Sequence, residues 1–263
     1  MSSVAIEIAN APARVNVRAL SVEVGPPQAR IATLDGLDVD IAPGQFVCVL
    51  GPSGCGKSTL LAAIAGHIAA TQGTIAVDDE AVERPHPERG LVFQQHTLFP
   101  WKRVIDNVAF GLKMKGVGAN ERRRQAAELL ELVGLGGFDS HYPAQLSGGM
   151  QQRVEIARVL INRPRVLLMD EPFGALDAQT RRMMQTLLLD IWTKVRTTVV
   201  FVTHDIEEAL FLADRILMLS KRPARVVADI PVPLARPRSD DTTLDPVFVD
   251  IKRQCLSLLR DAK

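Results

Sequence analysis

The chain has 263 residues, of which 47% are hydrophobic, so it is long enough to bury the core of one large domain with an extension. Its net charge of +1 and its aromatic content of 5% argue against a protein that coats nucleic acid, and we expect no nucleic-acid partner. Its three cysteines are too few and too irregularly spaced for a disulfide framework or a metal site, which favours a reducing compartment such as the cytoplasm.

Segments with strand and helix patterns alternate along the chain, which favours a mainly parallel sheet with helices packed against it. A buried strand is predicted to lead through a Gly-rich loop into a helix over 58–65. Strands are predicted at 4–8, 44–51, 165–172, 197–205, 215–220 and 225–232. The last two of these are expected to be more exposed than the others.

Two further helices and a C-terminal extension are also predicted. Residues 120–137 carry an apolar stripe, with Asn120 as the expected N-cap and glycines at the end. Residues 234–246, rich in Pro, Asp and Arg, are expected to form a linker before an amphipathic helix over 247–259. The longest apolar stretch, 60–70, falls short of the roughly 20 residues that span a bilayer, so we expect neither a membrane span nor a signal peptide.

The segment GPSGCGKS at 51–58 fits the phosphate-loop pattern GxxxxGK[ST] and lies between a predicted strand and a predicted helix, as that loop requires. Glycines let the backbone wrap a phosphate, Lys57 reaches the β- and γ-phosphate oxygens, and the Ser58 hydroxyl holds Mg²⁺. Cys55 is interpreted as a tolerated small residue whose thiol is open to alkylation only without nucleotide. The expected nucleotide-binding residues are Gly51, Pro52, Ser53, Gly54, Cys55, Gly56, Lys57, Ser58 and Thr59.

Two acids, Asp170 and Glu171, follow the apolar strand predicted from residue 165. A carboxylate at that position orients Mg²⁺ beside a phosphate loop, which is the role expected for Asp170. Glu171 is expected to polarise the attacking water as a general base, with His204, at the end of the next strand, near the γ-phosphate. The alternative is that Glu171 only caps a helix or turn before Pro172.

A second phosphate-binding turn is predicted in the middle of the chain. In LSGGMQQRVEIARVL, residues 146–160, a Ser-Gly-Gly run leads directly into apolar residues at helical spacing. Helix N-termini of this kind hold anions, because unpaired backbone amides and the helix dipole both point at the incoming charge. One chain therefore carries two separate turns suited to phosphate.

Six motifs occur in one order along the chain. They are the phosphate loop at 51–58, VFQ ending in Gln94, LSGGMQQR at 146–153, LLMDEP at 167–172, ALD at 175–177 and THD at 203–205. In this order they resemble the ATP-binding cassette (ABC) family over nearly the whole chain. Met150 stands where the family most often has Gln, and Gly174 stands where Ser is frequent. We expect activity to survive both departures.

The resemblance implies an α/β fold with a P-loop NTPase core, an N-terminal antiparallel β subdomain and an inserted helical signature subdomain at about 95–160. The ABC ATPase domain would span 1–233, and 234–263 would form the C-terminal linker and short helix. ATP and Mg²⁺ are the implied cofactors.

In the family, the signature turn of one cassette caps the γ-phosphate held by a second cassette. Ser147, Gly148 and Gly149 would therefore act in trans, on a second copy of the chain or on a related subunit. Gln94 would sense Mg²⁺ and the attacking water. The implied metal-contacting residues are Ser58, Gln94 and Asp170, and the implied catalytic residues are Glu171, His204 and Gln94.

Among cassette proteins, the segments 94–112, 171–181 and 203–219 look most like importer ATPases of the nitrate, aliphatic sulfonate, taurine and bicarbonate group. This resemblance implies an ATP-hydrolysing subunit that powers import of a small anionic solute through an integral membrane permease. A periplasmic or extracellular solute-binding protein would be an indirect partner, and the subunit would sit peripherally at the cytoplasmic face of the inner membrane.

Two alternatives to an importer subunit are weaker. A small-molecule kinase also uses a phosphate loop, but it has no use for the LSGG turn or for Gln94. A soluble cassette ATPase, not coupled to transport, would share every motif. Such proteins usually carry two cassettes or a long coiled-coil insertion, and this sequence shows neither.

Phe99, Pro100 and Trp101 follow Gln94 closely, and large apolar groups in a Pro-containing loop are costly to expose. We expect them to line a groove for a short cytoplasmic helix of the permease. The alternative is that Phe99 and Trp101 seal the core of the helical subdomain itself.

An aromatic ring is missing where cassette ATPases usually stack adenine, some way before the phosphate loop. The first aromatic residue of this chain is Phe46, inside the predicted strand. Val22 or Val24 is therefore expected to face the base, and the identity of the base is expected to matter little.

Overall fold

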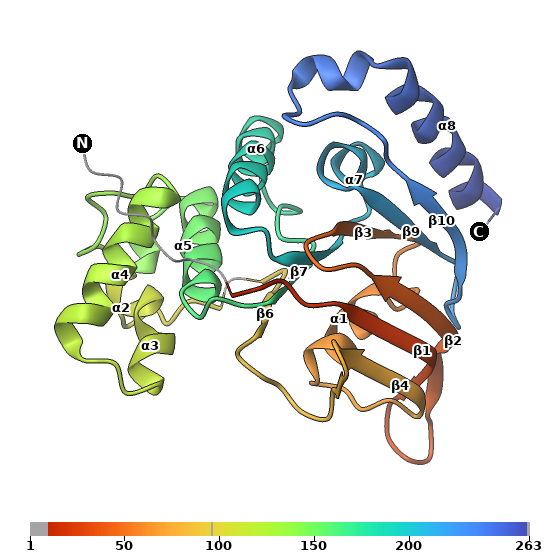
Figure 1. The fold of residues 1–263 in the computed structure, drawn as a ribbon, viewed down its shortest axis with the longest axis horizontal. Coiled ribbons are helices and arrows are strands. Elements are labelled where there is room, and N and C mark those ends of the chain that lie inside the picture. Colours follow the sequence, from red (N-terminus) through yellow and green to blue (C-terminus); the bar gives the residue numbers. More distant parts are fainter. Residues whose placement is uncertain (1–9, 96, 262–263) are drawn as a thin grey trace.

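The computed structural model describes residues 10–95 and 97–261. It contains two β-sheets with helices around them (Figure 1). The strand predicted at 4–8 lies outside the described residues, so its structure stays a prediction.

The central sheet has six strands in the order β10-β9-β3-β8-β7-β6 among the described residues. Neighbouring strands run parallel except for β10, which is antiparallel to β9. The strands are β3 (Phe46–Leu50), β6 (Arg89–Val92), β7 (Val166–Asp170), β8 (Thr198–Val202), β9 (Arg215–Leu219) and β10 (Val226–Pro231). The predicted α/β class with a mainly parallel sheet is confirmed.

One expectation about this sheet is wrong. β9 is predicted to be more exposed than the other strands, but four of its five residues are buried, because apolar clusters cover both faces of the sheet: Ile216 and Met218 lie in one cluster and Leu217 and Leu219 in the other. An inner strand of a parallel sheet that is covered on both faces needs apolar side chains on both faces. Only β10, at the sheet edge, has the exposed pattern that was predicted.

A second, antiparallel sheet is formed by strands from residues 15–81, in the order β2-β1-β4-β5. Its strands are β1 (Val15–Val24), β2 (Ile31–Ile41), β4 (Gln72–Val77) and β5 (Glu80–Ala81). Val15, Val17 and Val22 of β1 are buried in one apolar cluster with the first helix, α1 (Lys57–Ala65). The sheet matches the predicted N-terminal antiparallel β subdomain, and the cluster joins it to the phosphate-loop helix.

A group of helices lies to one side of the central sheet in Figure 1. It contains α2 (Val104–Val108), α3 (Phe110–Met114), α4 (Ala119–Leu132) and α5 (Gly148–Leu160). Asn120 is not the N-cap of α4, because the extended residue Gly118 already precedes the first turn and leaves Asn120 inside the helix. The predicted glycine stop is present, since Gly134 follows the helix in a left-handed conformation with φ of 70°.

Three helices complete the fold beside the central sheet: α6 (Ala178–Val195), α7 (Ile206–Leu212) and α8 (Pro246–Asp261). In Figure 1, α8 lies along the outside of α7 and β10. Its side chains Phe248 and Cys255 are buried against the core. The predicted C-terminal amphipathic helix is therefore present, one or two residues longer at each end than expected.

The linker predicted at 234–246 is instead a packed segment. Arg236 donates to the carbonyl of Leu212 at 2.7 Å, and Arg238 donates to the carbonyls of Leu210 and Phe211 at 3.0 Å each. Burial lowers the pKa of the Arg238 guanidinium to about 10, which leaves it charged at neutral pH. The last carbonyls of a helix need donors, so these arginines cap α7 and fix the segment to it.

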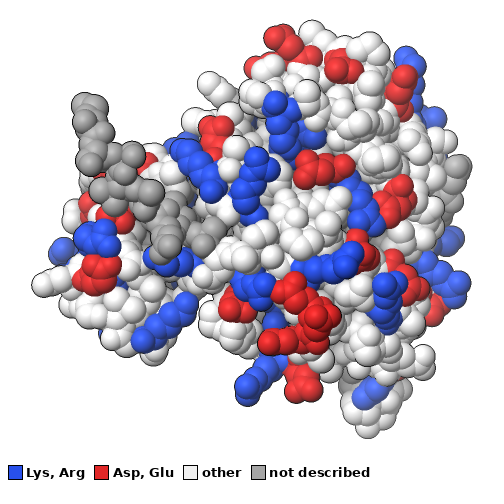
Figure 2. Space-filling model, in the orientation of Figure 1, with Lys and Arg blue, Asp and Glu red and all other residues white. Residues whose placement is uncertain are grey.

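Acidic and basic side chains are interspersed over the face seen in Figure 2, in keeping with the net charge of +1. None of the described helices is long and apolar enough to cross a membrane.

Candidate functional site

Three functional segments lie at one edge of the central sheet, because their strands pair in parallel. Val49 of β3 lies opposite Val202 of β8, and Val202 lies opposite Asp170 of β7. The carboxyl ends of parallel neighbours fall on the same edge of a sheet, where ligands bind in open α/β folds. The phosphate loop after β3, the acids Asp170 and Glu171, and His204 after β8 therefore meet there.

The phosphate loop runs directly into α1, which begins at Lys57. The Lys57 side chain is buried, and its ammonium donates to the carbonyls of Gly51 at 2.9 Å and Pro52 at 3.0 Å. These contacts hold the positive charge inside the curve of the loop. The first amides of α1 have no partner within the helix, so the loop combines free N–H donors, a helix dipole and a cation.

Gly56, the N-cap of α1, has φ of 125°, a conformation that L side chains rarely adopt. A Cβ atom at this position would lie 2.9 Å from side-chain atoms of Thr33 and Leu34 of β2. Only glycine therefore lets the loop pass this close to the antiparallel sheet. The residues of the loop fit a bound polyphosphate, as the sequence predicted.

Cys55 corrects one expectation about the loop. Its side chain is 1% exposed and packs in the core beneath the loop, so the thiol is closed to alkylation even without nucleotide. Burial raises the pKa of the thiol, while the charges of Lys57 and Arg222 act in the opposite direction. Only the backbone of Cys55 is placed to contact a phosphate.

Ser58 and Asp170, two of the predicted metal ligands, contact each other directly. The Ser58 hydroxyl donates to Oδ1 of Asp170 at 3.0 Å, across 112 residues of sequence. Burial raises the pKa of the Asp170 carboxyl, the hydrogen bond from Ser58 lowers it, and the negative charge of Glu171 raises it further. A hydroxyl and a carboxylate are oxygen ligands of the kind that Mg²⁺ prefers, so this pair fits the predicted cation.

Glu171 and His204 lie together beside that pair. Nδ1 of His204 lies 2.9 Å from Oε2 of Glu171, and the imidazole is largely exposed while the carboxylate is mostly covered. Glu171 has φ of 43°, a strained conformation for a residue with a side chain, and strain of this kind clusters at functional sites. Its backbone also begins a turn, since the amide of Gly174 donates to its carbonyl at 3.1 Å. The backbone therefore forms a turn, as the alternative required, while the side chain faces His204.

The signature turn begins α5 as predicted. Ser147 is the N-cap, and its hydroxyl accepts a hydrogen bond from the amide of Met150 at 3.3 Å. A Cβ atom on Gly149 would lie 2.7 Å from a side-chain methyl of Thr180 at the start of α6, so a larger residue here would have to displace that side chain. Ser147 and Gly148 are exposed, which leaves the turn open to another molecule.

Some predicted site residues make no hydrogen bond to the rest of the site within one chain. Gln94 is exposed after β6, and within the described residues it makes no hydrogen bond to the phosphate loop or to Asp170. Ser147, Gly148 and Gly149 likewise make no hydrogen bond to the phosphate loop or to Asp170 within the described residues. The single chain therefore assembles the phosphate loop, the acids and His204. Gln94 follows β6 at the same end of the sheet, because Val92 of β6 pairs in parallel with Met169 of β7.

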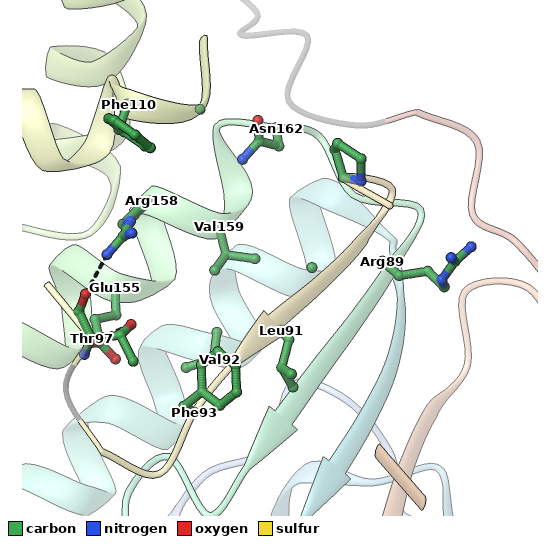
Figure 3. A pocket seen from close by; sticks show the side chains of 13 residues that line it. Arg89, Leu91, Val92, Phe93, Thr97, Phe110, Glu155, Arg158, Val159 and Asn162 are labelled. Atoms are coloured by element: carbon green, nitrogen blue, oxygen red, sulfur yellow. Dashed lines mark hydrogen bonds between the residues drawn. The ribbon is translucent and has the colours of Figure 1, made fainter. Parts of the chain in front are cut away.

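A cavity of about 260 Å³ lies between β6 and the helical group (Figure 3). Val159, Arg158 and Glu155 of α5 line one side and Phe110 of α3 another, while Arg158 donates to the carbonyl of Thr97 at 2.8 Å. Phe93 and Thr97 also line the cavity, and Gln94 directly follows Phe93 in the sequence.

Phe99, Pro100 and Trp101 do not line this cavity, and their predicted groove for a permease helix stays a prediction. The Phe99 ring packs edge-on against Phe110 at 4.8 Å, and the Arg158 guanidinium lies 4.2 Å from its centre. Phe99 therefore packs against Phe110, which lines the cavity. Trp101 is 71% exposed, which rules out the alternative that it seals a core.

The structure excludes one of the two residues that were expected to face the adenine base. Val22 is completely buried between the antiparallel sheet and α1, because β1 turns that side chain toward the core. It cannot face a nucleotide base. Val24, at the end of β1, is only partly buried and remains the candidate.

One residue beside the phosphate loop escaped the sequence interpretation. Arg222, in the turn between β9 and β10, donates to the carbonyl of Gly54 at 2.7 Å. The available signal was the basic run KRPAR after an apolar strand, but nothing in the sequence places that strand next to β3.

The chain is similar in sequence to ATP-binding proteins of known importers. It matches the ABC transporter family over residues 34–174, more than half of its length. It is 49% identical over 238 residues to the taurine import ATP-binding protein TauB of Rhizobium johnstonii, covering 89% of this chain and 91% of that protein. It is 45% identical over 236 residues to the nitrate import ATP-binding protein NrtD of Synechocystis, covering 88% and 89%.

A solved structure agrees with this assignment. The ATP-binding cassette MJ0796, in a dimeric post-hydrolysis state bound to ADP and Pi, superposes with a TM-score of 0.73 at 33% identity, over 83% of this chain and 98% of that one. Nothing in these similarities favours a small-molecule kinase or a cassette that is not coupled to transport. The chain belongs to the ABC transporter family and is an ATP-hydrolysing cassette of that family.

Proposed function

We propose that this cassette powers import of a small anionic solute, of the nitrate, sulfonate, taurine or bicarbonate type, through a membrane permease. Relatives named for taurine and nitrate import share nearly half of its residues over almost the whole chain. The observation that carries the ATPase half of the proposal is the meeting of the phosphate loop, Asp170, Glu171 and His204 at one sheet edge.

The nucleotide and metal contacts follow from that geometry. Residues Gly51 to Thr59 would hold the phosphates of ATP through their amides, with Lys57 exchanging its carbonyl contacts for phosphate oxygens. Ser58, Asp170 and Gln94 would hold Mg²⁺, which neutralises charge that develops on the phosphates. Mg²⁺ binding requires the ionised Asp170 carboxylate, so it would weaken once a falling pH protonates that group.

Glu171 acts as the general base and takes a proton from the attacking water. His204 holds Oε2 of this carboxylate and so fixes the direction in which the other oxygen points. Asp205, directly after His204, is the N-cap of α7 and accepts from the amide of Glu207 at 2.9 Å, which anchors the histidine to the start of a helix.

The complete site requires two chains. Ser147, Gly148 and Gly149 would close over the γ-phosphate held by a second cassette, either the same chain or a related subunit. The ATPase domain would comprise residues 1–233, including the helical subdomain at about 95–160, with 234–263 as its C-terminal segment.

The permease would contact the surface beside Gln94. Nucleotide at the site would move Gln94, and through it the border of the cavity between β6 and α5. Trp101, exposed and 5.7 Å from the Phe99 ring, would be a permease contact next to that cavity. The subunit would then lie peripherally on the cytoplasmic face of the inner membrane, and a solute-binding protein would act on the opposite side of the permease.

Glu171→Gln should bind ATP normally, form a stable ATP-bound dimer and hydrolyse ATP about 10² to 10⁴ times more slowly, because the general base is lost. Steady-state hydrolysis and nucleotide affinity of the purified chain measure both effects. Glu207→Gln, a matched change at an exposed acid on α7, should retain turnover. Near-normal hydrolysis by Glu171→Gln would remove Glu171 from this role.

Trp101→Glu should leave the fold intact and abolish association with the permease. Its side chain is exposed, and surface substitutions usually change stability by no more than about 0.5 kcal/mol. Thermal melting and co-purification with the co-expressed permease report the two effects. Leu244→Glu, at a side chain that is 77% exposed on the C-terminal segment, serves as the control and should keep the permease. An unfolded Trp101→Glu chain, or one that still binds the permease, would contradict the proposed contact.

Val24→Tyr should tighten ATP binding by up to about tenfold, since an aromatic ring adds roughly 0.5 to 1.5 kcal/mol beyond burial. Because the unmodified chain has no aromatic ring there to stack on the base, it should hydrolyse GTP at a rate within about an order of magnitude of that for ATP. Val24→Leu adds apolar volume without a ring and should change affinity little. A strong preference for ATP, or an aromatic ring stacked on the base in a nucleotide-bound structure, would refute this assignment.

A further inference from the structure

The turn between β9 and β10, residues 220–225, lies against the phosphate loop. β9 pairs with β3 in parallel, with Met218 opposite Leu50, so both strands end at the same sheet edge. A Cβ atom on Gly51 would lie 3.0 Å from the carbonyl oxygen of Leu219. The residues that follow Leu219 therefore emerge beside the loop that follows Leu50.

The Arg222 side chain makes the direct contact. Its Nη2 atom donates to the carbonyl of Gly54 at 2.7 Å, although the two residues are 168 positions apart. The peptide unit that carries this carbonyl also carries the amide of Cys55, which donates to the carbonyl of Pro52 at 3.3 Å. Both ends of one peptide plane in the middle of the loop are thus fixed by hydrogen bonds.

This peptide plane belongs to a series of hydrogen bonds that ends at Lys57. The carbonyl of Pro52 accepts both the Cys55 amide and the Lys57 ammonium, which also holds Gly51. Arg222 forms the outer end of this network, and Lys57 forms the inner end. When Lys57 exchanges its carbonyls for phosphate, the contact from Arg222 is left to hold the loop from outside.

The turn is itself fixed to β2, so it gives Arg222 a firm base. The amide of Ala224 donates to the carbonyl of Thr33 at 2.8 Å, and the amide of Asp35 donates back to the carbonyl of Ala224 at 3.0 Å. Nε of Arg225 donates to the Asp35 carboxylate at 3.1 Å. Thr33 is the residue that Gly56 passes closely, so β2, the turn and the loop form one continuous contact.

We propose that Arg222 is a positioning residue for nucleotide binding, which presets the phosphate loop through the Gly54 carbonyl. A loop held in its binding conformation loses less conformational entropy when the phosphates arrive. The guanidinium also places a positive charge outside the loop, where it favours an anionic ligand. Arg222 does not touch the attacking water, so its effect falls on nucleotide affinity and not on the chemical step.

Arg222→Gln should raise the Kd and the KM for ATP about 5- to 20-fold, as expected for loss of a charge-assisted hydrogen bond. The turnover at saturating ATP should stay within about twofold of the unmodified chain, because Glu171 and His204 are untouched. Arg222→Lys keeps a charged donor and should recover affinity to within about threefold. Fluorescent-nucleotide titration and steady-state hydrolysis of the full chain measure these quantities.

Lys221→Gln is the matched control, since it removes an exposed cation from the same turn without touching Gly54. ATP affinity of Arg222→Gln within twofold of the unmodified chain would overturn the proposal. Equal losses in Lys221→Gln and Arg222→Gln would also overturn it, because bulk charge would then explain the effect. Loss of turnover together with lower melting temperature in both Arg222→Gln and Arg222→Lys would assign Arg222 a general structural role instead.

Discussion

Parallel pairing of β3, β8 and β7 is the constraint on which the rest of this structure depends. It sets three carboxyl ends side by side, so residues 51–59, 170–171 and 203–205 meet although they are far apart in the chain. The Ser58–Asp170 and Glu171–His204 contacts are direct consequences of that register. Buried side chains on the two faces of these strands pack in two separate apolar clusters, and a slip of one residue would exchange the side chains between those clusters and disrupt both packings.

Some segments at this end of the sheet are held by hydrogen bonds, and others are exposed. The phosphate loop is fixed from inside by Lys57 and from outside by Arg222, and the Arg236 and Arg238 guanidinium groups cap the end of α7. Gln94, Ser147 and Gly148, by contrast, are exposed and make no hydrogen bond to the loop within the described residues. Under the proposed function, such a site is preorganised for binding and would become complete when a second molecule supplies the signature turn.

Much of the fold and of the site could be predicted because the signals were local. The phosphate loop, the acids at a strand end and the Ser147 cap each depend on a few neighbouring residues. The errors concern tertiary contacts. Strand β9 and the thiol of Cys55 are buried by partners distant in sequence, and Val22 points inward because of its strand register. The segment 234–246 reads as a linker from its prolines, yet its arginines satisfy carbonyls of α7 that no local pattern reveals.

Cross-linking between two chains tests the two-chain site most directly. The three native cysteines are buried, so a thiol introduced at exposed Ser147 or Ser53 would react first with a short bifunctional maleimide. A mixture of Ser147→Cys and Ser53→Cys chains, each carrying Glu171→Gln, should yield a cross-linked dimer that increases with ATP, while each chain alone should not. Cross-linking of Ser147→Cys chains to one another, or a yield that does not depend on ATP, would contradict a site built from the phosphate loop of one chain and the signature turn of the other.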